Sequence, residues 1–153
     1  MTFRVYQGKP TVVYKNRAGA DTHTLEVGSA VAMDSLVAGT ITHLAGDSDD
    51  KIWGVAQKAG NAGDTIAGVP VLMAEESVTW EVGTDSDGGA AASDVGTYVA
   101  IDTEDTANMN ATVDISDKAP AHFLITEVVS ATRVRGRFAR TALRQPAGDA
   151  LDS

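Results

Sequence analysis

Hydrophobic positions along the chain follow the two-residue period of β-strands rather than the period of helices. No stretch of a dozen residues keeps apolar side chains at helical spacing without an interrupting glycine or proline. Short runs rich in β-branched and aromatic residues recur instead, at Thr11–Tyr14, Thr24–Val27, Thr40–His43, Ile52–Gln57, Val69–Met73, Val78–Val82, Thr97–Ile101, Thr112–Ile115, His122–Val129 and Thr132–Phe138. Glycine- and aspartate-rich turns separate several of them. This pattern predicts an all-β fold, built as a barrel or a sandwich.

The last two runs predict a hairpin, because only Ser130 and Ala131 separate them. In the second run, Arg133, Arg135 and Arg137 alternate with small or apolar residues. A period of two places these three guanidinium groups on one face of the strand. That face is either an ordinary solvated surface or a contact stripe that pairs with carboxylates. The alternation leaves both interpretations open.

The two ends of the chain differ from its middle. Residues 1–23 contain one strand-like run in otherwise polar sequence, and residues 141–153 contain proline, glycine and two aspartates with little to bury. We therefore expect an extended N-terminal arm over 1–23, a β-barrel body over 24–140 and a flexible C-terminal tail over 141–153. The sequence has no repeat with a period of 20–50 residues.

Composition limits the possible partners. The chain has 153 residues and no cysteine, so disulfides and thiolate chemistry are absent. No apolar run approaches the ~18 residues needed to cross a bilayer, and the first residues lack the layout of a signal peptide. The net charge of -9 argues against nucleic acid as a partner. We expect a soluble protein that binds neither membrane nor nucleic acid.

Charge is unevenly distributed along the chain. Residues 1–17 hold four basic and no acidic residues, residues 18–132 hold three basic and 19 acidic residues, and residues 133–153 hold five arginines and two aspartates. Basic ends around an acidic middle suit a protein whose ends lie against acidic surfaces, such as another copy of itself. The alternative is that acidic loops only keep the body soluble.

Motifs that carry catalytic or metal chemistry are missing. The sequence has no Gly-x-Ser-x-Gly elbow and no phosphate-binding glycine loop, and its aspartate-rich turns match no calcium-loop pattern. His23, His43 and His122 stand singly, without the spacing of a metal site. Paired carboxylates for sugar cleavage stay open, although an aromatic content of 5% gives little for sugar stacking. We expect no enzymatic activity, no cofactor and no metal, with Trp53 and Trp80 in a core or a subunit contact.

The middle of the chain resembles a known family. Leu25–Val31, Gly39–Ile41, Ile52–Ala56, Ala62–Asp64 and Val69–Val71 form a progression of entry strand, glycine turn, I-x-G-V-A-type strand, Gly-Asp turn and strand. This progression resembles the head decoration, or cement, proteins of tailed bacteriophages. The resemblance covers roughly residues 24–82, with weaker support to about residue 140. It implies a compact β-barrel or β-tulip body.

The resemblance also implies a function. Such proteins add to an assembled icosahedral shell, commonly as trimers at three-fold and quasi-three-fold positions, and stabilise it. A flexible N-terminal arm that reaches along the shell is typical of them. We therefore expect a structural virion protein on the outer capsid surface, made in the host cytoplasm, with the major capsid protein and other copies of itself, as a homotrimer, as partners. The Arg133–Arg144 region has no place in the family pattern, which leaves the docking end undecided.

The candidate contact residues come from both ends of the chain. They are Phe3, Arg4, Tyr6, Lys9, Tyr14 and Arg17 in the expected arm, and Arg133, Arg135 and Arg137 in the last strand. Alternative functions are another virion component, such as a tail, head-fibre or baseplate protein, and a β-module that binds glycans or cell surfaces. A glycan-binding module would show exposed aromatic residues in one patch, and an enzyme would show a pocket that gathers carboxylates and histidines.

Overall fold

Nearly all of the regular structure is β-strand. The computed structural model of the chain describes residues 2–17, 23–33, 39–44, 51–85, 89–102 and 111–143. Within these ranges eleven strands and two single-turn 3₁₀-helices form, which confirms the expected all-β, barrel-like class. None of the helices in this part of the chain is long and apolar enough to span a membrane.

The N-terminal barrel consists of consecutive strands of the sequence. They are β2 (Val12–Arg17), β3 (Ala30–Met33), β4 (Thr40–His43), β5 (Ile52–Ala56) and β6 (Ile66–Met73), and they close in the order β2-β4-β3-β5-β6. Its interior holds an apolar cluster of Leu25, Val31, Ile41, Trp53, Ala56, Ile66, Val69 and Val71. Burial of alternate residues along these strands gives the barrel its own small core.

The C-terminal part is a six-stranded sheet that also closes on itself. It contains β1 (Arg4–Gln7), β7 (Thr79–Thr84), β8 (Tyr98–Ile101), β9 (Thr112–Asp114), β10 (Phe123–Ser130) and β11 (Arg133–Phe138), in the order β1-β7-β11-β10-β8-β9. A parallel pairing of β7 with β9 closes five of these strands into a second barrel, and β1 extends it at β7. The 3₁₀-helices η1 (Ala92–Asp94) and η2 (Arg140–Ala142) lie in connections.

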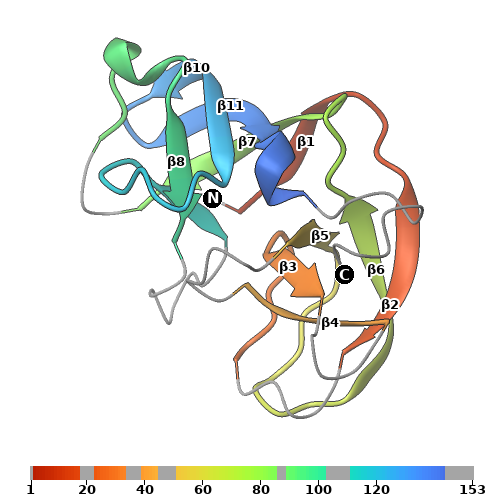
Figure 1. The fold of residues 1–153 in the computed structure, drawn as a ribbon. Helices are drawn as coiled ribbons and strands as arrows, with labels where there is room; N and C mark the ends of the chain where they lie inside the picture. Colours follow the sequence, from red (N-terminus) through yellow and green to blue (C-terminus); the bar gives the residue numbers. More distant parts are fainter. Residues whose placement is uncertain are drawn as a thin grey trace.

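The start of the chain belongs to the C-terminal barrel (Figure 1). β1 pairs with β7, and the chain then crosses to the N-terminal barrel through β2, which pairs with β6. Phe3 is only 2% exposed, and its ring packs against those of Phe123 and Phe138 at centroid distances of 5.7 and 5.1 Å. The expectation of an extended arm is therefore wrong for residues 2–17. Burial of Phe3 and strand pairing hold this segment in the body.

Two strand predictions also change. Ala30–Met33 forms β3, although its run of four apolar residues lacks alternation, because one face of β3 points into the N-terminal barrel and the other into the main core. Thr24–Val27 is not a strand; only Leu25 forms an isolated bridge, with Gly60. At the other end, Leu143 is buried and bridges to Ile52 of β5, so the expected tail does not begin at residue 141. Residues 144–153 lie outside the described residues.

The two barrels share one core. Residues on the outer side of β3 and β5, together with Leu44, pack against the aromatic interior of the C-terminal barrel; this cluster includes Ala30, Ala32, Leu44, Ile52, Val55, Phe3, Trp80, Val82, Phe123, Ile125, Val134 and Phe138. Trp53 and Trp80 are both buried, as core residues should be. The barrels therefore support each other, and a surface built on either one rests on a rigid base.

Candidate functional site

The structure brings most of the predicted contact residues together on one surface. Arg4 and Tyr6 of β1 and Arg133, Arg135 and Arg137 of β11 lie on the outer face of the C-terminal sheet, with the strand β7 between β1 and β11. We call this surface, together with Glu81 of β7 and Glu127 of β10, the arginine face. The remaining candidates lie elsewhere: Phe3 in the core, Arg17 buried in the N-terminal barrel, Tyr14 exposed on β2 and Lys9 exposed between β1 and β2.

The arginines of β11 share a face because the strand alternates. Val134, Gly136 and Phe138 are buried, whereas Arg133 and Arg135 are half-buried and Arg137 is exposed. The predicted hairpin is confirmed: β10 and β11 pair antiparallel around a turn at Ala131 and Thr132. A Cβ atom on Gly136 would lie 2.0 Å from the carbonyl oxygen of Leu124, so only glycine fits between the two strands there.

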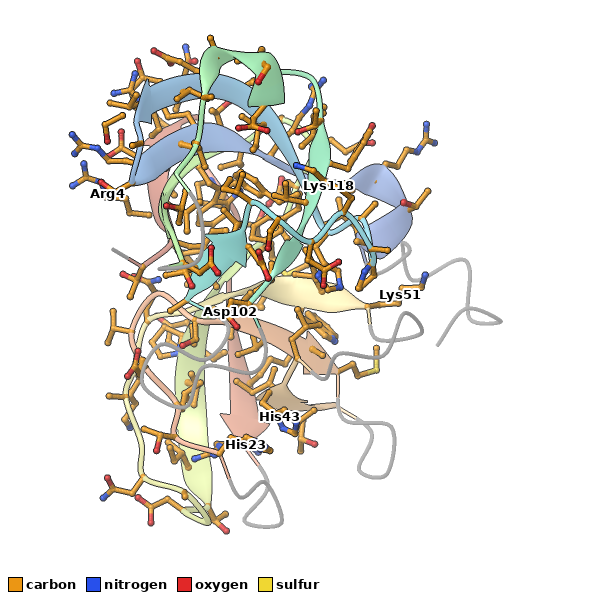
Figure 2. All side chains as sticks on the ribbon, turned by 90° about the vertical axis from the view of Figure 1, so that its left-hand side faces the viewer. Arg4, His23, His43, Lys51, Asp102 and Lys118 are labelled. Atoms are coloured by element: carbon orange, nitrogen blue, oxygen red, sulfur yellow. The ribbon has the colours of Figure 1, made fainter. Side chains whose placement is uncertain are left out.

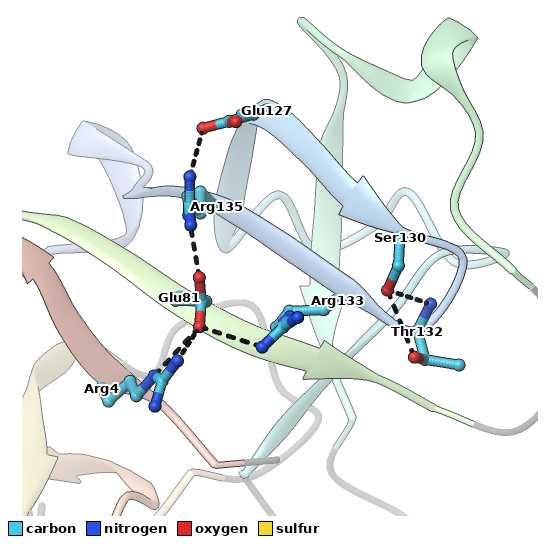
Figure 3. A network of polar contacts seen from close by, with 7 residues as sticks. All are labelled: Arg4, Glu81, Glu127, Ser130, Thr132, Arg133 and Arg135. Carbon is cyan, nitrogen blue, oxygen red and sulfur yellow. Dashed lines mark hydrogen bonds and ion pairs between the residues drawn. The ribbon is translucent and has the colours of Figure 1, made fainter.

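Glu81 is the centre of the arginine face (Figure 3). Its side chain is only 3% exposed, and its carboxylate accepts hydrogen bonds from the guanidinium groups of Arg4 and Arg135, the latter at 2.8 Å. Arg133 forms a looser ion pair with the same carboxylate at 3.7 Å. Arg135 also contacts Glu127 at 3.0 Å. Two strands, β1 and β11, therefore contribute three guanidinium groups that a single buried carboxylate on β7 holds in place.

The electrostatics of this centre follow from its contacts. Hydrogen bonds from Arg135, and then from Arg4, hold the pKa of Glu81 below its ordinary range and outweigh the effect of burial. Three arginines against two glutamates leave the cluster with net positive charge. The sequence did not identify Glu81. Its alternation with Trp80 and Val82 indicates an outward-facing side chain, but only the pairing of β1 and β11 on either side of β7 reveals its partners.

Tyr6 adds an aromatic ring to the same surface. The guanidinium carbon of Arg135 lies 3.7 Å from the centre of the Tyr6 ring, which is a cation–π contact. The contact joins β1 to β11 across β7. Of the two interpretations of the arginine stripe, pairing with carboxylates therefore applies to Arg133 and Arg135, but their partners belong to the same chain.

Arg137 differs from the other two arginines of β11. Its cross-strand neighbour on β10 is Leu124, which in turn lies opposite Tyr98 of β8. Among the described residues, no hydrogen bond or ion pair involves the Arg137 side chain, which is exposed. A groove of about 230 Å³ runs beside it, lined by Glu76, Tyr98, Leu124, Arg137, Phe138, Ala139 and Arg140. This end of the arginine face combines an exposed cation with the side chains of Leu124 and Tyr98.

Arg17 is not a surface contact residue. It is 1% exposed, and its guanidinium group donates hydrogen bonds to the carbonyl oxygens of Asn61, at 2.8 Å, and of His23. The inward-facing side of β2 therefore ties together two loops of the N-terminal barrel. Sequence reasoning placed Arg17 in a free arm, and the error follows from treating β2 as outside the body.

Two of the three histidines, which stand singly in the sequence, lie together in the structure. His23 and His43 lie together in the lower half of the view in Figure 2, with ring centroids 3.5 Å apart. His122 is buried, and its Nδ1 accepts a hydrogen bond from the backbone N–H of Ile101 at 3.0 Å. Burial lowers the pKa of His122 to about 4, although Asp117 acts in the opposite direction. Within the described ranges, no three His, Cys, Asp or Glu residues gather as a metal site.

Comparisons of the chain with models of known protein families, with curated proteins and with solved structures found no match. A functional assignment therefore depends on the sequence resemblance and on the geometry of the arginine face.

Proposed function

We propose that this chain is a non-enzymatic structural protein of a bacteriophage virion, which binds the outer surface of the icosahedral head and stabilises it. The observation that carries this proposal is the arginine face. The guanidinium groups of Arg4, Arg133 and Arg135 are held in place by Glu81, so they lose little side-chain entropy when a partner binds. The natural partner of this face is an acidic surface, and the proposed one is the major capsid protein.

The sequence resemblance to decoration proteins supports the same proposal, since it also predicts a compact all-β body. Docking through a sheet face differs from docking through a flexible arm. In this proposal the N-terminal strand contributes Arg4 and Tyr6 to the contact as part of the body. We further propose that copies group in threes on the head. A map of decorated heads with isolated single copies would contradict that grouping.

The alternative of a glycan-binding module receives less support from this face. Tyr6 is half-exposed, but one side of its ring is covered by the Arg135 guanidinium group. Tyr98 lies on β8, which pairs with β10 and β9 and not with β1. The two rings do not form one continuous stacking platform of the kind that sugar binding needs.

Binding to empty heads of the phage whose genome carries the gene tests the proposal. Arg137→Glu should sharply reduce the amount of protein that co-sediments with the heads, because Arg137 is exposed and has no partner among the described residues. Lys58→Glu is the matched control: Lys58 is exposed on the N-terminal barrel, and the substitution changes the net charge equally. Failure of the unchanged protein to bind heads would overturn the function. Equal binding by both variants would overturn the choice of face.

A further inference from the structure

Among the described residues, one edge of β2 in the N-terminal barrel has no strand partner along most of its length. β2 pairs with β6 from Val12 to Arg17, but it pairs with β4 only at Asn16 and Arg17. Edges of this kind present backbone N–H and C=O groups to a further strand.

The register of β2 against β6 determines which backbone groups of β2 point toward this open edge. Tyr14 lies opposite Pro70, which has no N–H and whose carbonyl oxygen accepts a hydrogen bond from Gln57 on the other side of β6. Tyr14 and Pro70 therefore form a pair without ladder hydrogen bonds, and Val12 with Leu72 is the next such pair. The bond from Met73 N–H to the carbonyl oxygen of Thr11 agrees with this alternation. The N–H and C=O groups of Val12 and Tyr14 consequently point away from β6.

These groups have no hydrogen-bond partner within the part of the chain that the structure describes. The side chains beside them are also exposed and apolar: Val12 is 48% and Tyr14 is 71% exposed. Val13 and Lys15 face the other way, and the Lys15 Nζ lies 4.2 Å from the centre of the Trp53 ring. A register shift between Lys15 and Arg17 ends the regular edge. The open site therefore spans Thr11–Lys15 and offers backbone groups with two apolar side chains.

We propose that this edge binds an extended, acidic segment of a partner protein by strand addition. The unpaired backbone groups select an extended chain, and Val12 and Tyr14 select apolar side chains at every second position of it. Lys9 is exposed just before this stretch and Lys15 ends it, so these two lysines favour carboxylates at the ends of the bound segment. Glu75 is engaged on the β6 side of the strand, where its carboxylate accepts the N–H of Thr11 at 2.7 Å.

Charge also disfavours the simplest competing occupant, which is the same edge of a second copy. Antiparallel pairing of two β2 strands would bring Lys9 and Lys15 of one copy toward those of the other, and like charges placed across strands are destabilising. The strand-addition site is independent of the arginine face, because it lies on the other barrel. Either proposal can fail without the other.

A short synthetic peptide tests the proposal on the full chain. The probe is an acetylated and amidated heptapeptide of the sequence Glu-Val-Thr-Val-Thr-Val-Glu. We expect it to shift the amide NMR signals of Val12 and Tyr14 and to slow their hydrogen exchange. Absence of both effects at millimolar peptide, or shifts confined to other strands, would overturn the proposal.

Controls separate backbone pairing from charge. The same peptide with N-methyl groups on alternate residues, or with lysine in place of both glutamates, should bind about tenfold more weakly, which corresponds to ~1.4 kcal/mol. Tyr14→Ser should weaken binding similarly, because it removes an apolar side chain without adding charge, whereas Tyr98→Ser on the other barrel should leave it unchanged. If the N-methylated peptide binds as well as the original, the partner is not held by strand addition. If the lysine peptide binds as well as the original, the partner segment need not be acidic.

Discussion

The C-terminal sheet buries a carboxylate, that of Glu81, beneath the arginine side chains of its outer face. The N-terminal barrel instead buries a guanidinium group, that of Arg17, on the inward-facing side of β2. Glu81 is surrounded by arginine side chains that remain in contact with water, with Arg4 60% exposed. Arg17 donates instead to backbone carbonyl oxygens of two loops. Both charges are satisfied, but only the first arrangement displays charge to a partner.

The difference shows how the same residue type acquires different roles. Arginines around Glu81 can bind a partner from the positions in which Glu81 holds them, because their donors are only partly used and their side chains reach solvent. Arg17 cannot, because it is buried and its hydrogen bonds hold the barrel loops. An arginine near a chain end therefore indicates an interaction surface only when its strand direction and its partners are known.

The largest effect should come from removing the Phe3 ring from the core that the two regions share. Phe3→Ala removes a buried ring from the aromatic cluster with Phe123 and Phe138, and we expect the free energy of unfolding to fall by about 3–5 kcal/mol. Urea unfolding followed by tryptophan fluorescence measures it. Tyr14→Ala, an exposed aromatic in the next strand, should stay within ~0.5 kcal/mol of the unchanged protein. If Phe3→Ala is as stable as Tyr14→Ala, Phe3 does not hold the N-terminal segment in the body, and the expectation of an independent arm would be favoured again.

The second effect concerns the buried charge of the N-terminal barrel. Arg17→Met fills similar space but leaves the carbonyl oxygens of Asn61 and His23 without their donor, so we expect a loss of about 2–3 kcal/mol in the same assay. Lys15→Met is the matched control, since it removes only a cation–π contact of about 0.5–1 kcal/mol with Trp53. If both variants lose the same small amount, Arg17 does not hold the loops.

The third effect is a pH dependence within the C-terminal barrel. The pKa of His122 falls from 6.5 to about 4 in the folded protein, so the unfolded chain takes up a proton first as the pH falls. Stability is therefore lost as pH decreases below about 6.5, by ~2 kcal/mol at pH 5. His122→Asn, which can still accept the Ile101 N–H, should flatten the stability profile between pH 7 and 5. An unchanged slope in this variant would assign the dependence to other groups.

Strand positions were largely predictable, and the pairing of strands was not. Thr40–His43 forms a strand with the predicted bounds, and the hairpin before Arg133 is confirmed. Arg4–Gln7 escaped prediction because four residues carry too little alternation, and its role depends on a partner strand far along the chain. The same long-range pairing creates the site around Glu81. Local patterns report which way a side chain points, but not which strand lies beside it.

The smallest effect should come from Glu81 itself. Glu81→Gln leaves Arg4, Arg133 and Arg135 without their shared carboxylate, but these arginines are partly solvated and can turn toward water. We expect the melting temperature to fall by a few degrees at low salt, and the deficit to narrow as added salt screens the arginines from one another. Glu127→Gln, which removes a more exposed partner of Arg135 alone, should change it less.

The pH dependence of the Glu81 effect gives it a distinctive signature. Because arginine contacts lower the pKa of Glu81 from 4.5, its contribution is fully present above about pH 4.5 and is lost as the pH falls through the lower, folded value. The advantage of the unchanged protein over Glu81→Gln should therefore persist at pH 5 and shrink only in stronger acid. This window lies below the one in which His122 first acts. If the stability lost in Glu81→Gln changes with neither salt nor acid, the substitution has caused a packing defect. The arginine face would then not depend on the Glu81 charge for its order.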